Sequence, residues 1–97
     1  MRVSFNSEAL AEVEEATRWY RDNGGAAPSR AFVLELRRVV DLAAENPNLG
    51  SPGSHCVLRQ YLKRFPYTRV FRIQNQMLRV IAVAHQSCRP GYWAGRR

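Results

Sequence analysis

The chain has 97 residues, of which 45% are hydrophobic and 24% are charged. This length suits one domain with one core, and the composition excludes a disordered or fibrous chain. The longest apolar run, Val80 to Ala84, is too short to cross a membrane, and the N-terminal segment carries charges where a signal peptide needs an apolar core. We therefore expect one cytoplasmic domain over residues 1–97, with no membrane partner.

Charge is divided unevenly along the chain. Residues 1–54 hold six arginines and eight acidic residues, a net of −2, whereas residues 55–97 hold nine basic residues and no acid, a net of +9, which together give the overall +7. The positive half is expected to attract phosphate groups or an acidic partner. It lacks the carboxylates that hold Mg²⁺ in a two-metal nuclease, and two cysteines are too few for a disulfide framework or a four-cysteine zinc site. We expect no metal and no cofactor.

The first half of the sequence begins with a short strand pattern. Arg2 to Phe5 alternates as a strand does, and Asn6 or Ser7 then caps a helix that runs from Glu8 to about Asp22. Acidic residues gather in the first half of this helix, where they suit the helix dipole. The sequence therefore predicts a strand followed directly by a helix.

A second helix is expected after the glycine pair at 24–25. Pro28 fits its first turn, and the Asn46-Pro47 pair ends it. The short connection predicts an antiparallel helical hairpin. Each helix has an apolar stripe that must be buried against another element: Leu10, Val13, Thr17 and Tyr20 in the first, and Phe32, Leu36, Val39 and Ala43 in the second.

The hydrophobic period changes after a loop at residues 46–54. Residues 56–63 alternate as in a strand, and Pro66 interrupts the pattern. One side of this strand is mostly apolar, and the other carries Arg59, Tyr61 and Lys63.

Two further strands are expected to form a hairpin. Thr68 to Gln74 and Met77 to Ala84 are rich in strand-forming residues, and the pair at 75–76 fits a two-residue turn. Residues 80–84 are apolar on both sides, which is typical of a central strand. The pattern predicts an α+β fold, in which an N-terminal helical hairpin packs on a three- to four-stranded, mainly antiparallel sheet.

Several stretches of this sequence resemble a known family. The helical segments EALAEVEEATRWY and AFVLELRRVVDLAAENPNLG are followed by LKRFPYTRVFRI and VIAVAHQSCRPGYW. In this order they resemble the RelE/ParE superfamily of toxins from type II toxin-antitoxin and plasmid stabilisation operons, over nearly the whole chain. The most specific pieces are Arg64 to Tyr67, Ala82 to His85, and Arg89 to Trp93.

The resemblance implies a toxic activity restrained by a cognate antitoxin, through which oligomers can form. ParE-like members of the superfamily poison DNA gyrase, whereas RelE-like members cleave mRNA in the ribosomal A site. We expect an acidic amphipathic segment of the antitoxin to cover the exposed stripe of the helical hairpin or the sheet edge.

The sequence contains candidate site residues for each of the two mechanisms. Metal-free RNA cleavage needs a base, an acid and cations around the phosphate, and the candidates for these roles are His85, Tyr92 and Arg59. Strict alternation places His85 on the same strand face as Arg79, Ile81 and Val83. The candidates for binding a target or a phosphate are Lys63, Arg64, Arg69, Arg72, Arg89 and Trp93.

The match to the ribonuclease members is incomplete. Where those members carry an arginine at the start of the strand, this sequence has Thr68, and Arg69 one step later points to the helix-covered face, where it would be buried. We therefore expect a ParE-like toxin that inhibits gyrase. The alternatives are a RelE-like, ribosome-dependent mRNA endoribonuclease and a non-toxic basic module that binds nucleic acid.

Overall fold

The computed structural model describes residues 2–45, 51–52, 57–74, 77–89 and 91–97. Most of the predicted loop at 46–54, the predicted turn at 75–76 and Cys56 lie outside the described residues. The elements in chain order are β1 (Arg2–Phe5), α1 (Ser7–Gly24), α2 (Ala26–Glu45), β2 (Ser51–Pro52), β3 (Leu58–Tyr61), β4 (Tyr67–Gln74) and β5 (Met77–His85).

The helical hairpin forms as the sequence predicted. The side chain of Asn6 caps α1 by accepting hydrogen bonds from the backbone N–H groups of Glu8 and Ala9, at 2.7 and 3.3 Å. Gly25 joins α1 to α2 with a φ of 92°, a conformation that glycine adopts without strain. Pro28 lies in the first turn of α2, where its missing N–H group costs nothing.

The strands form one mixed sheet in the order β1-β5-β4-β3-β2. β1 pairs with β5 in parallel, and all other neighbours are antiparallel. The α+β class and the helical hairpin are confirmed. The sheet has five strands, more than the three or four expected, because the two residues of β2 pair with β3.

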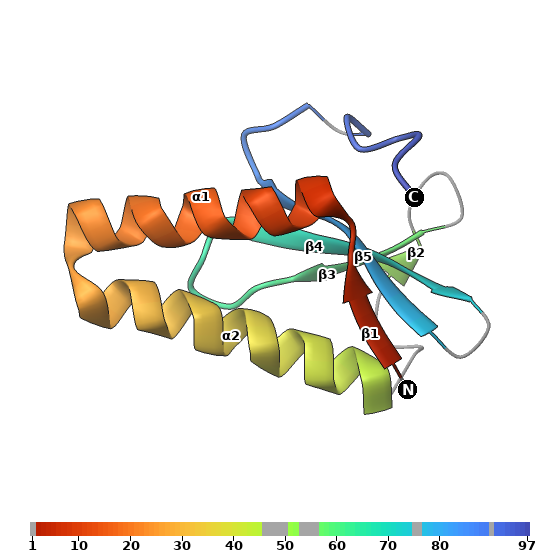
Figure 1. The fold of residues 1–97 in the computed structure, drawn as a ribbon, viewed down its shortest axis with the longest axis horizontal. Coiled ribbons are helices and arrows are strands. Elements are labelled where there is room, and N and C mark those ends of the chain that lie inside the picture. The colour runs from red at the N-terminus through yellow and green to blue at the C-terminus, as the bar shows by residue number, and fades with distance from the viewer. Residues whose placement is uncertain (1, 46–50, 53–56, 75–76, 90) are drawn as a thin grey trace.

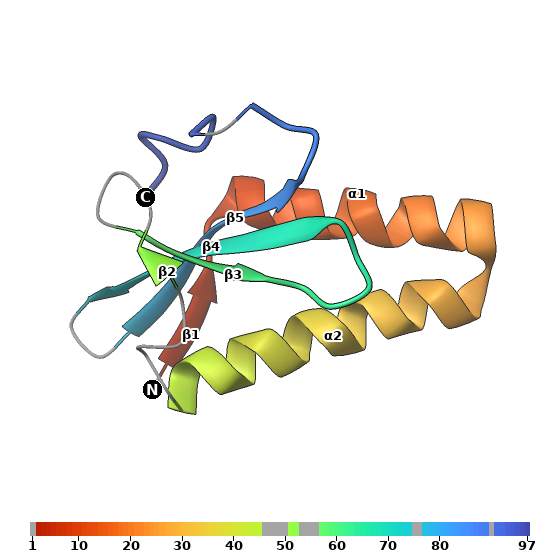
Figure 2. The same cartoon turned by 180° about the vertical axis from the view of Figure 1, so that it is seen from behind.

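The helices cover one face of the sheet, and the C-terminal residues cover part of the other. Figures 1 and 2 show α1 and α2 on one face and the C-terminal residues 91–97 folded back beside the other, which we call the tail face. The core under the helices contains Phe32, Phe71 and Val80, whereas Trp93 packs on the tail face in a smaller cluster with Val57, Val70, Ile81 and Ala82. Within the described ranges, neither helix is long and apolar enough to span a membrane.

A bulge in β5 changes which side chains share a face. Val70 lies opposite Ala82, but the next residue, Phe71, lies opposite Val80, so Ile81 is an extra residue in β5. Ile81 and Ala82 therefore both pack on the tail face. Beyond the bulge the alternation is reversed.

The reversal corrects the predicted orientation of His85. Val83 packs in the core under the helices, and the His85 ring contacts the Tyr67 ring on that same face, with the centroids 5.1 Å apart. The prediction that His85 and Val83 share a face with Ile81 was wrong, because strict alternation does not hold across an inserted residue.

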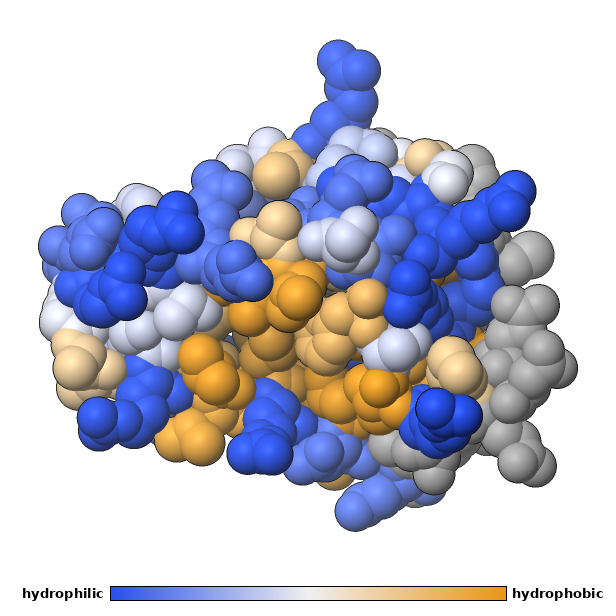
Figure 3. Space-filling view, in the orientation of Figure 1, coloured by the Kyte–Doolittle hydropathy of each residue, from blue (hydrophilic) through white to orange (hydrophobic). Residues whose placement is uncertain are grey.

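The outer surface of the hairpin exposes apolar side chains. Ala9 and Ala16, rather than Leu10, are the α1 residues that are fully buried against the sheet. Leu10 is 46% exposed and Val33 on α2 is 43% exposed. Figure 3 shows apolar surface gathered between the two helices on the side turned away from the sheet. We call Leu10, Val13 and Val33 the hairpin stripe.

Candidate functional site

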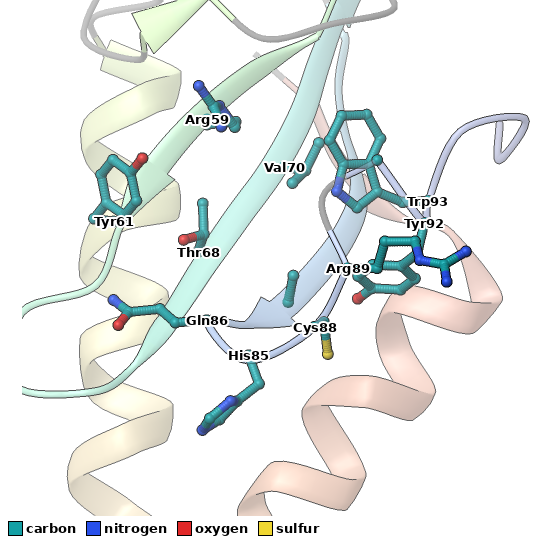
Figure 4. A pocket seen from close by; sticks show the side chains of 12 residues that line it. Arg59, Tyr61, Thr68, Val70, His85, Gln86, Cys88, Arg89, Tyr92 and Trp93 are labelled. Carbon is teal, nitrogen blue, oxygen red and sulfur yellow. The ribbon is translucent and has the colours of Figure 1, made fainter.

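A pocket of about 200 Å³ lies on the tail face, between the sheet and the C-terminal residues. Its floor comes from two neighbouring strands: Arg59 and Tyr61 on β3 stand beside Val70 and Thr68 on β4, which pair with them across the ladder. The predicted alternation of β3 is thus confirmed for Arg59 and Tyr61. Figure 4 shows Trp93 and Tyr92 on the opposite side of the pocket.

The side chains of His85 and Arg59 point in different directions. Both residues line the pocket, but Arg59 stands on the tail face whereas the imidazole of His85 is turned away from it, as Figure 4 shows. The backbone N–H of Ser87 donates a hydrogen bond to Nδ1 of His85 at 3.0 Å, and Oγ of Ser87 lies 2.7 Å from the same nitrogen. Nδ1 is therefore an acceptor here, and the proton of the neutral ring is on Nε2.

Tyr92 is held by a carboxylate from α1. Its hydroxyl donates a hydrogen bond to Oε2 of Glu12 at 2.5 Å. Burial, together with this carboxylate, raises the pKa of Tyr92 well above its usual value. A phenol that stays protonated and bonded to Glu12 is poorly suited to take a proton from a substrate.

Glu12 also satisfies the exposed edge of β5. β1 pairs with β5 only as far as Val80, so the outer edge beyond that point has no strand neighbour in the part of the chain that the structure describes. The backbone N–H of Val83 donates to Oε1 of Glu12 at 3.0 Å, and Nη1 of Arg96 donates to the same oxygen at 2.9 Å and to the carbonyl of Ile81 at 3.3 Å. Glu12 and Arg96 therefore take the place of a neighbouring strand.

Sequence reasoning missed Glu12. In the sequence it is one of several acidic residues that suit the N-terminal half of a helix, and it lies 80 positions before Tyr92. The only available signal was that the second half has no acid of its own, so a buried cation there must find its carboxylate on the helices.

Two of the predicted binding residues are buried. Arg69 is 0% exposed on the helix-covered face, as its register predicted, and this burial corrects its inclusion among the phosphate-binding candidates. Trp93 is 6% exposed and packs on Val70 and Ile81, so its ring is part of the core and is not displayed for a target.

Burial is costly for Arg69. One terminal nitrogen donates to the carbonyl of Val39 at 3.3 Å and to Oε1 of Gln60, and the guanidinium lies 4.0 Å from the centroid of the Phe71 ring. Its other two nitrogens have no hydrogen-bond partner among the described residues. Desolvation lowers the pKa of Arg69 to about 10.

The remaining predicted cations lie at the surface in separate places. Lys63 and Arg64 are exposed in the turn between β3 and β4, where the Lys63 N–H donates to Glu35 at 2.6 Å. Arg72 is half-buried on β4, and Arg89 is exposed at the rim of the pocket with its guanidinium turned outwards (Figure 4). The structure thus brings Arg59 and Arg89 to one pocket and leaves the others apart.

Comparison with known proteins identifies the family. The family model described as "ParE toxin of type II toxin-antitoxin system, parDE" matches residues 3–90. The chain belongs to the ParE toxin family. The comparison with curated proteins finds no match for this ParE-family toxin.

A solved structure supports the same assignment at the level of the fold. The ParE-family chain is similar to a chain of the structure titled "Chromosomal ParDE TA system from P. aeruginosa", with a TM-score of 0.76 and 17% sequence identity. The match covers 88% of this chain and 95% of that chain. The predicted resemblance is confirmed: this is a ParE-like type II toxin, and its family implies a cognate antitoxin as partner.

Proposed function

We propose that this ParE-family toxin inhibits DNA gyrase by binding to it in the cytoplasm, and that its antitoxin prevents this binding. The family match over residues 3–90 is the observation that carries the proposal. A binding mechanism requires no catalytic set. The cleavage groups that the sequence offered are not assembled in the described residues, since His85 is turned away from Arg59 and the Tyr92 hydroxyl is bonded to Glu12.

The basic surface provides the contact with gyrase in this proposal. Lys63, Arg64, Arg72 and Arg89 all belong to the half of the chain that has no acidic residue, and Lys63, Arg64 and Arg89 are exposed. A net positive charge on a small domain speeds its association with an acidic or DNA-bound target, even where the basic side chains lie in separate places.

A supercoiling assay tests the target. Purified toxin is added to gyrase, ATP and relaxed plasmid, and we expect loss of supercoiling with accumulation of cleaved DNA. Cells induced for the toxin alone are examined in parallel for mRNA cut sites. Normal supercoiling together with codon-phased mRNA cuts would replace this proposal with the ribonuclease alternative. Normal supercoiling with intact mRNA would favour the remaining alternative, a non-toxic basic module that binds nucleic acid.

For the antitoxin, we propose that an acidic amphipathic helix docks on the hairpin stripe. Leu10 and Val33 are exposed and Val13 is half-buried, and Figure 3 shows an apolar area between the two helices. Next to Val13, a pocket of about 290 Å³ is lined by Arg18, Arg21 and one carboxylate, that of Glu14, and its two arginines would complement an acidic partner. A helix that lays an apolar face into such a groove buries the stripe and places its acids near these arginines.

Charge insertion in the stripe tests this docking mode. Leu10→Glu and Val33→Glu are expected to weaken capture of the acidic protein encoded beside the toxin gene at least tenfold while gyrase inhibition is kept. The matched control is Gln86→Glu, which adds the same charge at an exposed position beyond β5. Equal capture by all three variants would contradict docking on the stripe.

A further inference from the structure

The tail face is a cationic surface with almost no opposing charge. All eight acidic residues of the chain lie between positions 8 and 45, within α1 and α2. Glu8 and Glu12 form ion pairs with Arg96 near the C-terminus, and Glu15 lines a separate pocket beside Cys88 and Tyr92. The guanidinium groups of Arg59 and Arg89 therefore stand on the tail face without a carboxylate among the described residues that line their pocket.

Arg59 and Tyr61 offer two different kinds of contact from one strand. They are two residues apart on β3, so their side chains leave the same face about 7 Å apart. Arg59 is half-buried, and no carboxylate lines its pocket among the described residues. Tyr61 is 56% exposed, so its ring is available at the rim. Thr68, opposite Tyr61, adds a hydroxyl to the floor.

The composition of this pocket suits one class of ligand. A cation without a carboxylate partner beside an exposed aromatic ring is the combination by which proteins hold single-stranded nucleic acid, with phosphate on the cation and a base on the ring. A duplex keeps its bases stacked inside, so a ring on a strand face reaches only an unpaired base.

We propose that this pocket binds one nucleotide unit of a single-stranded nucleic acid, with its phosphate on Arg59 and its base stacked on Tyr61, and that it does so without cleaving the strand. Arg89 contributes from the rim by turning its exposed side chain inwards. The absence of cleavage follows from the orientation of His85 and from the bond between Tyr92 and Glu12. Binding at this pocket does not depend on gyrase inhibition.

Fluorescence anisotropy tests the proposal directly. Labelled single strands of DNA and of RNA, about 12 nucleotides long, and a DNA duplex of the same sequence are titrated with the full chain. We expect the single strands to bind more tightly than the duplex. Stronger binding of either the DNA or the RNA strand identifies the source of the ligand, and equal binding means that only the shared backbone and base stacking are recognised.

Matched variants assign the binding to the pocket. Arg59→Gln and Tyr61→Ala should each weaken binding of the single strand at least about fivefold. Two controls should leave it within about twofold: Arg37→Gln, which removes the same charge from the exposed face of α2, and Tyr61→Phe, which keeps the ring. Tyr61 is exposed, so its variants test the proposal even if Arg59→Gln disturbs the fold.

Three outcomes would overturn the proposal. Equal loss in Arg59→Gln and Arg37→Gln would mean that only overall charge matters, and unchanged binding by Tyr61→Ala would remove the stacking contact. Shortening of the labelled RNA or DNA, seen on a denaturing gel, would contradict binding without cleavage. If the toxin does not inhibit gyrase in the supercoiling assay, these binding measurements keep their meaning. The proposals for gyrase inhibition and for nucleic-acid binding can therefore be refuted independently.

Discussion

The hydroxyl of Tyr92 donates a hydrogen bond to the carboxylate of Glu12 at 2.5 Å and thereby joins the C-terminal residues to α1. The same carboxylate accepts from the backbone of Val83 in β5 and from Arg96. One side chain therefore ties together a helix, the bulged strand and the tail.

Glu12→Ala is expected to lower the free energy of unfolding by about 3 kcal/mol, because it leaves the Val83 N–H and the Tyr92 hydroxyl without their acceptor and removes one of the two carboxylates paired with Arg96. Urea unfolding followed by circular dichroism measures this loss. Glu14→Ala removes an exposed carboxylate from the same helix and serves as the control. A loss no larger than that of the control would show that Glu12 does not hold the tail.

Tyr92→Phe should make the protein less sensitive to alkali. The pKa of Tyr92 is raised in the folded state, so its contribution is complete below the ordinary pKa of about 10 and is lost as the pH rises above it, because the unfolded state releases the proton first. Unfolding midpoints in urea between pH 8 and 11 should fall less steeply for the variant than for the wild type. Tyr61→Phe, at an exposed ring, should follow the wild type; parallel slopes for all three proteins would refute the assignment.

Arg69→Met is expected to raise the free energy of unfolding by about 1–3 kcal/mol, since methionine fills a similar volume without placing an incompletely paired charge in the core. Thermal unfolding at neutral pH measures the change. Arg37→Met, on the exposed face of α2, should shift stability by less than about 0.5 kcal/mol. A clear loss of stability in Arg69→Met would mean that its bonds to Val39 and Gln60 outweigh the cost of burial.

Arg64→Gly should stabilise the turn between β3 and β4. Arg64 has a φ of 69°, and a non-glycine residue in this left-handed region costs about 1 kcal/mol. The unfolding midpoint should therefore rise, whereas Lys63→Gly, at the neighbouring position, should lower it. If Arg64 contacts gyrase, the same variant will be more stable and yet a weaker inhibitor in the supercoiling assay. A lower midpoint for Arg64→Gly would contradict the strain.

Sequence patterns were sufficient wherever one element decides its own geometry. The Asn6 cap, the glycine at the hairpin turn and the position of Pro28 are set by local backbone chemistry. The period of two in β3 placed Arg59 and Tyr61 on one face correctly. The same alternation predicted that Arg69 faces the helices, and Arg69 is buried there.

Tertiary structure decided what depends on pairing between distant elements. The extra residue Ile81 reverses which side chains of β5 face the helices, and it thereby turns His85 away from Arg59. A local sequence pattern does not predict such a bulge, because the bulge depends on the pairing register between β5 and β4. The choice of Glu12 as partner for Tyr92, and the burial of Trp93 on the tail face, likewise follow from how the chain folds back. Short-range periodicity determines which side chains share a face of a helix or strand, whereas the three-dimensional packing decides which residues those side chains contact.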